Sequence, residues 1–474
     1  MDSSVLDQPR ERVSPSRLTE AARSSTTIAL VAIVVVGAAL RVWRLGFNGL
    51  TFDETFSAMA ARLPLGHLFD HLRTQDSHPP LDYLLRAPLA RSGAGDALLR
   101  APSLFFSVGA LVLFAWWMRN RGLAGIMATA VFAGSTFQIY YGGEARMYAL
   151  LELLGVASAV VAERWLRGSP AWCGWAAGVL VALALFDHVS GFLLAAGMFT
   201  IAGVRRDRRA WTWRASVAGG VGLWAVLWGA SFAHQAGGDW TNWIPGTSPT
   251  SVARAVSGQV TYLSGVEWLV FASVLPGAWC LWTRDRRLGL VWLAVGAVPF
   301  ALGAAIGVIS PFLIDRAVTV ASWASPLALG YLVAALVTRW RVAGLAVAAL
   351  LMVAIAAGSV AFLLSERYDS DRAIDHLERV VNMGDAILTR PARYATLPAY
   401  RIGVERWHGA HEVATPGIDN AVAFRADDAP ASGRIWLLTP VSFELTFPGY
   451  RSCPTTRGWT DGATHVVCLE RASG

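Results

Sequence analysis

Two short segments within the first hundred residues carry side chains that could transfer a proton or bind a cation. The first is Thr51-Phe52-Asp53-Glu54, in which Asp53 is a candidate general base or metal ligand. The same residues also fit a capping box, because a Thr followed three residues later by a Glu closes the first turn of a helix. The two interpretations are compatible, since a capped helix would hold the Asp53 carboxylate in a fixed position.

The second segment is the stretch D-S-H-P-P at residues 76–80. Proline suits the first turn of a helix and Asp or Ser can cap it, so one interpretation is simply a helix start. Asp76 and His78 are also candidate ligands for a metal or a phosphate. On this second interpretation, a divalent metal would be held by Asp53, Asp76 and His78.

Three further segments place ionisable groups at the ends of apolar runs. They contain Arg146, the pair Asp187-His188, and Arg316, which follows Asp315. Because the arginine fork matches a phosphate, Arg146 and Arg316 are candidates for gripping an anionic ligand. The structural alternatives are a snorkelling arginine, a capped turn and a local Asp–Arg pair.

Aromatic residues accompany these groups. Tyr148 lies two residues after Arg146, and Trp243 belongs to the stretch W-T-N-W-I-P that begins at Trp240. Tyr and Trp are enriched at membrane interfaces, so anchoring is one interpretation. The other is stacking on a sugar ring, which makes Tyr148 and Trp243 candidate sugar or acceptor contacts.

The composition indicates which kind of element must position these residues. Of the 474 residues, 54% are hydrophobic and 15% are charged, against about 25% charged in a soluble domain. A single soluble globule could not cover its exterior with so little charge. Four Cys exclude a disulfide scaffold, and 21 Trp with 20 Phe exclude a disordered chain. The sequence therefore predicts an all-α polytopic membrane protein.

A membrane-spanning helix needs about 20 mostly apolar residues. About eleven such runs are present, at residues 27–44, 100–117, 122–141, 147–164, 171–187, 189–204, 213–233, 266–282, 288–309, 317–337 and 342–364.

The short loops indicate the orientation. All 40 basic residues are arginines, and most loop arginines fall on one side of the predicted membrane. The positive-inside rule makes that side cytoplasmic, together with the tail at residues 1–26. We therefore expect a transmembrane domain at 27–364, with outer loops at 45–99 and 234–265 and an extracytoplasmic C-terminus. This arrangement suits the cytoplasmic membrane of a bacterium.

Residues 365–474 read as a small extracytoplasmic α/β domain. We expect a helix at 371–381 and strands at 386–389, 435–438 and 466–469. Cys453 and Cys468 both fall in this domain, in an oxidising compartment, and we predict a disulfide between them.

Several function classes are excluded. Neither GxxxxGK[ST] nor GxGxxG occurs, and the cytoplasmic loops are too short for a nucleotide-binding domain. We therefore expect no nucleotide cofactor. The arginines lie between hydrophobic runs and form no basic face interleaved with aromatics, so we expect no nucleic-acid partner.

Taken in order, the motifs resemble those of the GT-C membrane glycosyltransferases. Within that fold they look like family 39, the relatives of protein mannosyltransferases and aminoarabinose transferases. The resemblance covers roughly residues 27–340 and rests on D-E at 53–54, H-P-P-L at 78–81, E-A-R-M-Y at 144–148, His188, W-I-P at 243–245 and Arg316.

The resemblance implies roles for these residues. Asp53 matches the family's catalytic aspartate and Glu54 its acidic neighbour, and we predict both as catalytic residues. Arg146, Arg316, His78 and His188 would bind the phosphate of the donor. His78 stands where the aminoarabinose transferases carry a Lys, and the preceding Ser replaces a Glu that takes part in their metal site.

The resemblance also implies an activity. We expect an inverting transferase that moves a sugar from a polyprenyl-phosphate donor in the membrane to an acceptor, which is a protein, glycolipid or polysaccharide. Two alternatives are a transporter or flippase for a lipid-linked or amphipathic solute, and a non-catalytic scaffold or sensor. A transporter would show internal repeats and polar groups near the bilayer midplane. No repeat is evident, and the ionisable residues gather at one face.

Overall fold

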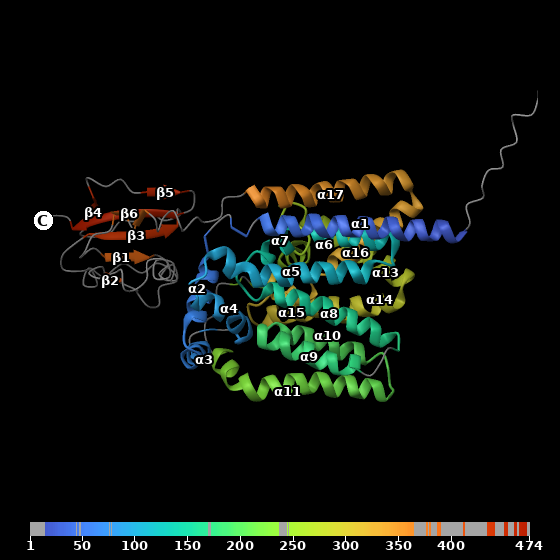
Figure 1. Ribbon diagram of the computed structural model, residues 1–474, viewed down its shortest axis with the longest axis horizontal. Helices are drawn as coiled ribbons and strands as arrows, with labels where there is room; N and C mark the ends of the chain where they lie inside the picture. The colour runs from blue at the N-terminus through green and yellow to red at the C-terminus, as the bar shows by residue number, and fades with distance from the viewer. Residues whose placement is uncertain are drawn as a thin grey trace, which may run out of the picture.

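Apolar runs become helices in a membrane because each backbone N–H must find its partner within its own segment. The computed structural model describes residues 15–43, 45–46, 49–74, 76, 78–168, 172–236, 244 and 246–364, with short pieces beyond residue 375. Helices, several of them interrupted, lie side by side in a bundle (Figure 1). They are α1 (Pro15–Trp43), α5 (Asp96–Met118), α6 (Gly122–Gly134), α7 (Thr136–Gly142), α8 (Tyr148–Leu166), α9 (Trp172–Asp187), α10 (Gly191–Ala202), α11 (Arg208–Ala236), α13 (Glu267–Arg284), α14 (Arg286–Val291), η1 (Trp292–Ala297), α15 (Val298–Ile309), η2 (Asp315–Ala321), α16 (Ala324–Arg339) and α17 (Arg341–Leu364).

Each of the eleven predicted runs overlaps one helix or one interrupted helix of this bundle. Among the described helices, five are long and apolar enough to cross a membrane by themselves. Two bent pairs raise that number to seven: α6 with α7, at 51°, and η2 with α16, at 67°. The predicted all-α membrane architecture is confirmed.

The bundle is apolar on both its inner and outer surfaces. Phe114, Phe132 and Trp323 are fully buried, whereas Val226 is 84% exposed and Ile309 90% exposed. Large exposed apolar side chains of this kind face lipid in a membrane protein, because water would penalise them. The surface composition therefore agrees with a multi-pass membrane protein.

The segment between α1 and α5 forms three short helices, α2 (Phe52–Arg62), α3 (Leu65–Thr74) and α4 (Leu81–Arg91). They gather at one end of the bundle (Figure 1). A fourth short helix, α12 (Pro249–Gly258), follows α11. In α3 the apolar face is buried through Leu68 and Leu72. These short helices place the residues singled out in the sequence next to the ends of the long helices.

The described part of the C-terminal region contains a small sheet. Its strands are β1 (Ala386–Thr389), β2 (His411–Glu412), β3 (Ile435–Pro440), β4 (Tyr450–Ser452), β5 (Trp459–Asp461) and β6 (Thr464–Arg471). The order is β2-β1-β3-β6-β4, with β5 also on β6. β1 runs parallel to β2 and β3, and β6 runs antiparallel to β3, β4 and β5.

The three strands expected from the sequence correspond to β1, β3 and β6. The helix expected at 371–381 lies mostly outside the described residues. Cys453 and Cys468 form the disulfide predicted for them, and both are buried with Trp436 in the small core of the sheet.

Candidate active site

The site begins with the N-terminus of α2. Thr51 and Glu54 form the capping box that their spacing predicts: the Thr51 N–H donates to Glu54 Oε2 at 2.8 Å, and the Glu54 N–H donates to Thr51 Oγ1 at 3.4 Å. Asp53 lies between them in the first turn. A capped helix end fixes the backbone that carries the Asp53 carboxylate.

Glu54 is fully buried, and both of its oxygens are occupied. Arg100 donates to Oε1 from Nε at 2.7 Å and to Oε2 from Nη2 at 2.8 Å. The Ala145 N–H donates to Oε1 at 2.7 Å. Burial raises the pKa of Glu54, but the hydrogen bonds and charge of Arg100 outweigh burial and lower the pKa to about 2.

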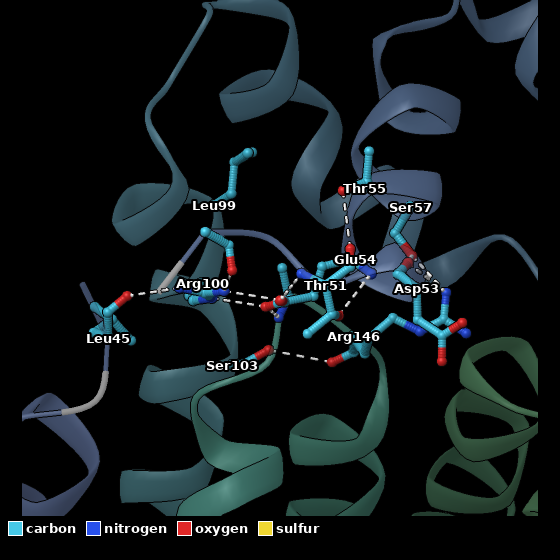
Figure 2. A network of polar contacts seen from close by, with 12 residues as sticks. Leu45, Thr51, Asp53, Glu54, Thr55, Ser57, Leu99, Arg100, Ser103 and Arg146 are labelled. Carbon is cyan, nitrogen blue, oxygen red and sulfur yellow. Dashed lines mark hydrogen bonds and ion pairs between the residues drawn. The ribbon is translucent and has the colours of Figure 1, made fainter. Parts of the chain in front are cut away.

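This geometry separates the two neighbouring carboxylates. Figure 2 shows Glu54 turned toward Arg100, with Asp53 on the other side of α2 near Arg146. Because four donors already occupy Glu54, it ties α2 to α5 and to the loop before α8. We therefore assign Glu54 a positioning role in place of the catalytic role that the family pattern implied.

Asp53 remains partly accessible, with 37% of its side chain exposed. Arg316 donates from Nη1 to Asp53 Oδ2 at 3.3 Å. Arg146 donates from Nη1 to the Asp53 backbone carbonyl at 3.2 Å. Burial raises the pKa of Asp53, but the charges of Arg146 and Arg316 outweigh it and lower the pKa below its ordinary value. Asp53 is therefore an ionised carboxylate beside two guanidinium groups.

Arg146 is held deep in the site, with only 6% of the residue exposed. Its Nη1 donates to Ser57 Oγ at 2.6 Å, and its Nη2 lies 2.8 Å from His78 Nε2. Figure 2 shows the side chain extending toward Ser57 and Asp53. Its Nε is buried and has no hydrogen-bond partner among the described residues. The snorkelling alternative does not hold, because this guanidinium faces the interior of the site.

A buried ion pair on α4 fixes the backbone of Arg146. Arg86 and Asp82 are about 1% exposed and pair at 2.8 Å. Arg86 Nη2 also donates to the Arg146 carbonyl at 2.9 Å, and Ser103 Oγ donates to the same carbonyl at 3.2 Å. None of the sequence motifs pointed to this pair. The i,i+4 spacing of Asp82 and Arg86 on a helix was the signal that could have found it.

Arg316 is fixed from a different part of the chain. Its backbone N–H donates to Asp315 Oδ1 at 2.7 Å. Asp315 in turn accepts a hydrogen bond from the Tyr262 hydroxyl at 2.5 Å. The Arg316 guanidinium lies 5.9 Å from the centre of the Tyr148 ring, within reach of a cation–π contact. The Asp315 side chain therefore positions the backbone of Arg316, while the guanidinium reaches Asp53.

The two histidines meet at the same place. Their rings are 5.3 Å apart, and His188 is 5.9 Å from Tyr148. Because a guanidinium can only donate, His78 Nε2 accepts from Arg146, so the proton of a neutral His78 ring lies on Nδ1. The Ser190 N–H donates to His188 Nδ1 at 3.1 Å, so His188 carries its proton on Nε2. Burial, with the nearby cations, lowers the pKa of His188 well below its ordinary value and keeps it neutral.

The residues predicted as metal ligands form hydrogen bonds with other protein groups. Arg146 contacts His78 Nε2 and the Asp53 backbone carbonyl, and Arg316 contacts the Asp53 carboxylate. Asp76 accepts from the Tyr83 hydroxyl at 2.5 Å and from the His78 N–H at 3.2 Å. Within the described residues no group of three or more His, Cys, Asp and Glu is placed to hold a metal ion. This donor set does not fit a divalent metal.

The structure thus brings five of the predicted residues together, namely Asp53, His78, Arg146, His188 and Arg316, with Tyr148 beside them. Trp243, the other candidate sugar contact, lies outside the described residues. The arrangement offers one ionised carboxylate, two cations and two imidazole rings. Such a set can take a proton from an incoming hydroxyl while stabilising a departing anion.

Neither a protein-family model nor a curated protein matches the sequence. Solved structures do share its fold. ArnT from Cupriavidus metallidurans bound to undecaprenyl phosphate aligns over 94% of this chain and 98% of its own, with a TM-score of 0.56 and 12% identity. The apo state of ArnT gives a TM-score of 0.57 and 13% identity.

The oligosaccharyltransferase of Archaeoglobus fulgidus, tethered to an acceptor peptide, aligns over 88% of this chain and 69% of its own. Its TM-score is 0.53 and its identity 12%. The chain therefore has the GT-C fold, as its motifs predicted. This fold is shared with ArnT and the archaeal enzyme at low sequence identity.

Proposed function

We propose that this protein is an inverting glycosyltransferase that moves a sugar from a polyprenyl-phosphate carrier to an acceptor at the membrane face where α2 lies. The observation that carries the proposal is the contact of Arg316 with the Asp53 carboxylate at 3.3 Å, with Arg146 beside it. The ArnT structure with undecaprenyl phosphate supports a carrier of that class. We further propose that this face is the outer face of a bacterial cytoplasmic membrane.

In the proposed reaction Asp53 accepts the proton of the acceptor hydroxyl. The acceptor oxygen then bonds to the anomeric carbon from the face opposite the phosphate, and the bond from that carbon to the phosphate oxygen breaks. The electron pair of the broken bond leaves with the phosphate. A transition state of this kind resembles an oxocarbenium ion, as in glycoside hydrolysis.

Arg146 and Arg316 stabilise the leaving phosphate as it gains charge. A neutral His188, with its proton on Nε2, supplies a hydrogen-bond donor at the same place. When the phosphate binds, it shares the charge of the two arginines, so the pKa of Asp53 rises and the carboxylate becomes a better base. No step needs a nucleotide or a metal, because the sugar is already linked to a phosphate and the guanidinium groups supply the positive charge.

The test separates chemistry from donor binding. The full-length protein is purified in detergent, and release of undecaprenyl phosphate is measured from a panel of undecaprenyl-phosphate-linked sugars in the presence of cell-envelope acceptors. Asp53→Asn is expected to lower turnover by about 10²- to 10⁴-fold, the usual contribution of a general base. Binding of undecaprenyl phosphate alone should change little.

Asp70→Asn is the matched control, because Asp70 is an exposed carboxylate on α3 in the same loop. It should keep full turnover. Full turnover in Asp53→Asn would remove Asp53 as the base. A protein that carries a labelled lipid-linked sugar across a vesicle membrane without releasing the sugar from its phosphate would be a transporter, and the proposal would fail.

A further inference from the structure

The end of the bundle opposite α2, α3 and α4 contains a cavity of about 780 Å³. α13 and α14 meet at this end (Figure 1), and the ends of α5, α6, α8 and α16 also line the cavity. Its volume falls within the range of about 300–1,000 Å³ that is typical of small-ligand sites. The reaction proposed at Asp53 makes no use of it.

The cavity carries an excess of positive charge. Its lining includes Arg119, Arg121, Arg164, Arg167 and Arg284, but only two carboxylates, Glu163 and Asp285. Those two carboxylates cannot neutralise five guanidinium groups.

Both carboxylates already pair with arginines of the cavity wall. Arg121 pairs with Glu163 and with Asp285, each at 2.6 Å, and Arg167 also pairs with Glu163 at 2.6 Å. Arg121 therefore joins α6 to the end of α8 and to the junction of α13 and α14. The carboxylates serve to build the wall of the cavity.

The remaining three arginines have no carboxylate partner among the described residues. Arg119 and Arg164 both lie over the ring of Trp116, with their guanidinium carbons 4.4 and 4.9 Å from its centre. Arg284 donates to Thr338 Oγ1 at 2.8 Å. Two cations on one indole ring repel each other, and a bound anion would relieve that repulsion.

One buried donor on the cavity wall is also unsatisfied. The Nε of Arg121 is buried and has no hydrogen-bond partner in the described part of the chain. A phosphate oxygen could accept from it. Trp116 and Leu123, which also line the cavity, are 38% and 39% exposed, so apolar surface that faces lipid borders the charged wall.

We propose that this cavity binds the phosphate headgroup of an anionic phospholipid from the membrane leaflet at this end of the bundle. Basic pockets between membrane helices recognise such headgroups. A basic loop is enough for arginines that only fix the orientation of the helices in the membrane. That role does not explain why these arginines line a cavity, why two of them share one indole ring or why a buried N–H has no hydrogen-bond partner among the described residues. The lipid's acyl chains would lie along the exposed apolar surface beside Trp116.

The experiment uses the full-length protein, stripped of lipid in detergent. Dioleoylphosphatidylglycerol is added, and retained lipid is counted by native mass spectrometry while the melting temperature is followed. Dioleoylphosphatidylcholine tests the need for net negative charge, and glycerol 1-phosphate tests the need for the lipid tail. Wild-type protein should retain phosphatidylglycerol and melt at a higher temperature with it, and should respond to neither of the other two.

The double variant Arg119→Gln/Arg164→Gln should weaken phosphatidylglycerol binding about 30-fold. Each arginine near an anionic lipid contributes a similar binding free energy, so the two losses add. The matched control is Arg286→Gln/Arg287→Gln, because these arginines are exposed on α14 at the same end and do not line the cavity. Arg284→Gln alone should weaken binding about fivefold and replaces the double variant if that variant does not fold.

Equal loss in the α14 control would show that only bulk charge matters and would overturn the proposal. Equal retention of phosphatidylcholine would do the same. Binding of glycerol 1-phosphate as tight as that of phosphatidylglycerol would overturn the assignment to a lipid, because the site would then take a soluble anion.

Discussion

Asp53 and Glu54 are neighbours in the chain, yet their surroundings give them different chemistry. Glu54 is fully buried among four donors, whereas Asp53 is partly exposed beside two cations. A carboxylate with every lone pair engaged cannot approach a substrate proton without losing those bonds. The role of each acid therefore follows from its partners and cannot be read from residue type alone.

The pKa of Asp53 predicts the pH dependence of the reaction. Because that pKa lies below its ordinary value of 3.8, the base stays ionised until the pH falls below that value. The acid limb of kcat/KM, which reports the free enzyme, should therefore lie below about pH 4. The acid limb of kcat should lie at higher pH, because bound phosphate shares the charge of the arginines.

Arg316→Gln removes one cation that lowers the pKa of Asp53, so the acid limb of kcat/KM should move to higher pH. Arg254→Gln, which changes an exposed arginine on α12, should leave the profile in place. An unchanged limb in Arg316→Gln would mean that Asp53 does not set the acid limb.

Glu54 links stability to pH. Its pKa is about 2 in the folded protein against an ordinary 4.5, so its contribution is present above pH 4.5 and is lost as the pH falls toward 2. A shift of that size corresponds to about 3 kcal/mol. Glu54→Gln should lower the melting temperature at pH 7 and flatten its dependence on pH below 4.5. Glu267→Gln, at a partly exposed position of α13 with no hydrogen-bond or ion-pair partner among the described residues, should do neither.

The guanidinium groups of Arg146 and Arg316 beside Asp53 predict that a metal chelator has little effect on turnover. Overnight treatment with EDTA, followed by removal of the chelator, should leave turnover within about twofold of the untreated enzyme, because Arg146 already provides the charge. Loss of activity that only Mg²⁺ or Mn²⁺ restores would contradict this assignment.

At the scale of elements, close packing brings Arg316 to Asp53. Gly155 on α8 faces η2, where a Cβ atom would lie 2.1 Å from the Val320 carbonyl oxygen. Only glycine at this position allows η2 to come so close to α8. Because η2 carries Arg316, this contact also positions Arg316. The position of Arg316 therefore depends on the absence of a side chain at Gly155.

Gly155→Ala should push η2 away from α8 and separate Arg316 from Asp53. We expect turnover and undecaprenyl phosphate binding to fall together, while Asp53 itself is unchanged. Gly109→Ala on α5 is the matched control, because its new Cβ would lie 3.8 Å from Leu153 in ordinary contact. Equal activity in the two variants would mean that the η2 contact does not position Arg316.

At the scale of the whole molecule, eleven spans would place the two termini on opposite sides of the membrane. Green fluorescent protein fluoresces only in the cytoplasm, so its fusion at the N-terminus should fluoresce. Alkaline phosphatase is active only outside the cytoplasm, so its fusion after residue 474 should be active. The Cys453–Cys468 disulfide agrees with an oxidising compartment at the C-terminus. Inactive phosphatase at that end would contradict the odd number of spans.

The amino-acid sequence by itself determined the membrane class, the eleven helical runs and the capped start of α2. Each of these depends on residues close together in the chain: about 20 apolar residues for a span, and four for a capping box. The chain order of the motifs was enough to predict the GT-C fold. Asp53, Arg146 and Arg316 could be selected because an ionisable group at a helix end in a membrane is costly and is therefore a candidate functional residue.

Only the tertiary structure decided which partners each of those residues meets. Asp53 meets Arg316 across 263 residues, and Glu54 meets Arg100 across 46. No local spacing encodes such pairs, since they depend on which helices pack together. The buried pair of Glu54 and Arg100 was hidden for this reason, although a charged residue inside an apolar run is costly enough to mark Arg100. The fold thus leaves Asp53 accessible and surrounds Glu54 with donors, because Glu54 faces Arg100 of α5 while Asp53 lies on the other side of α2 (Figure 2).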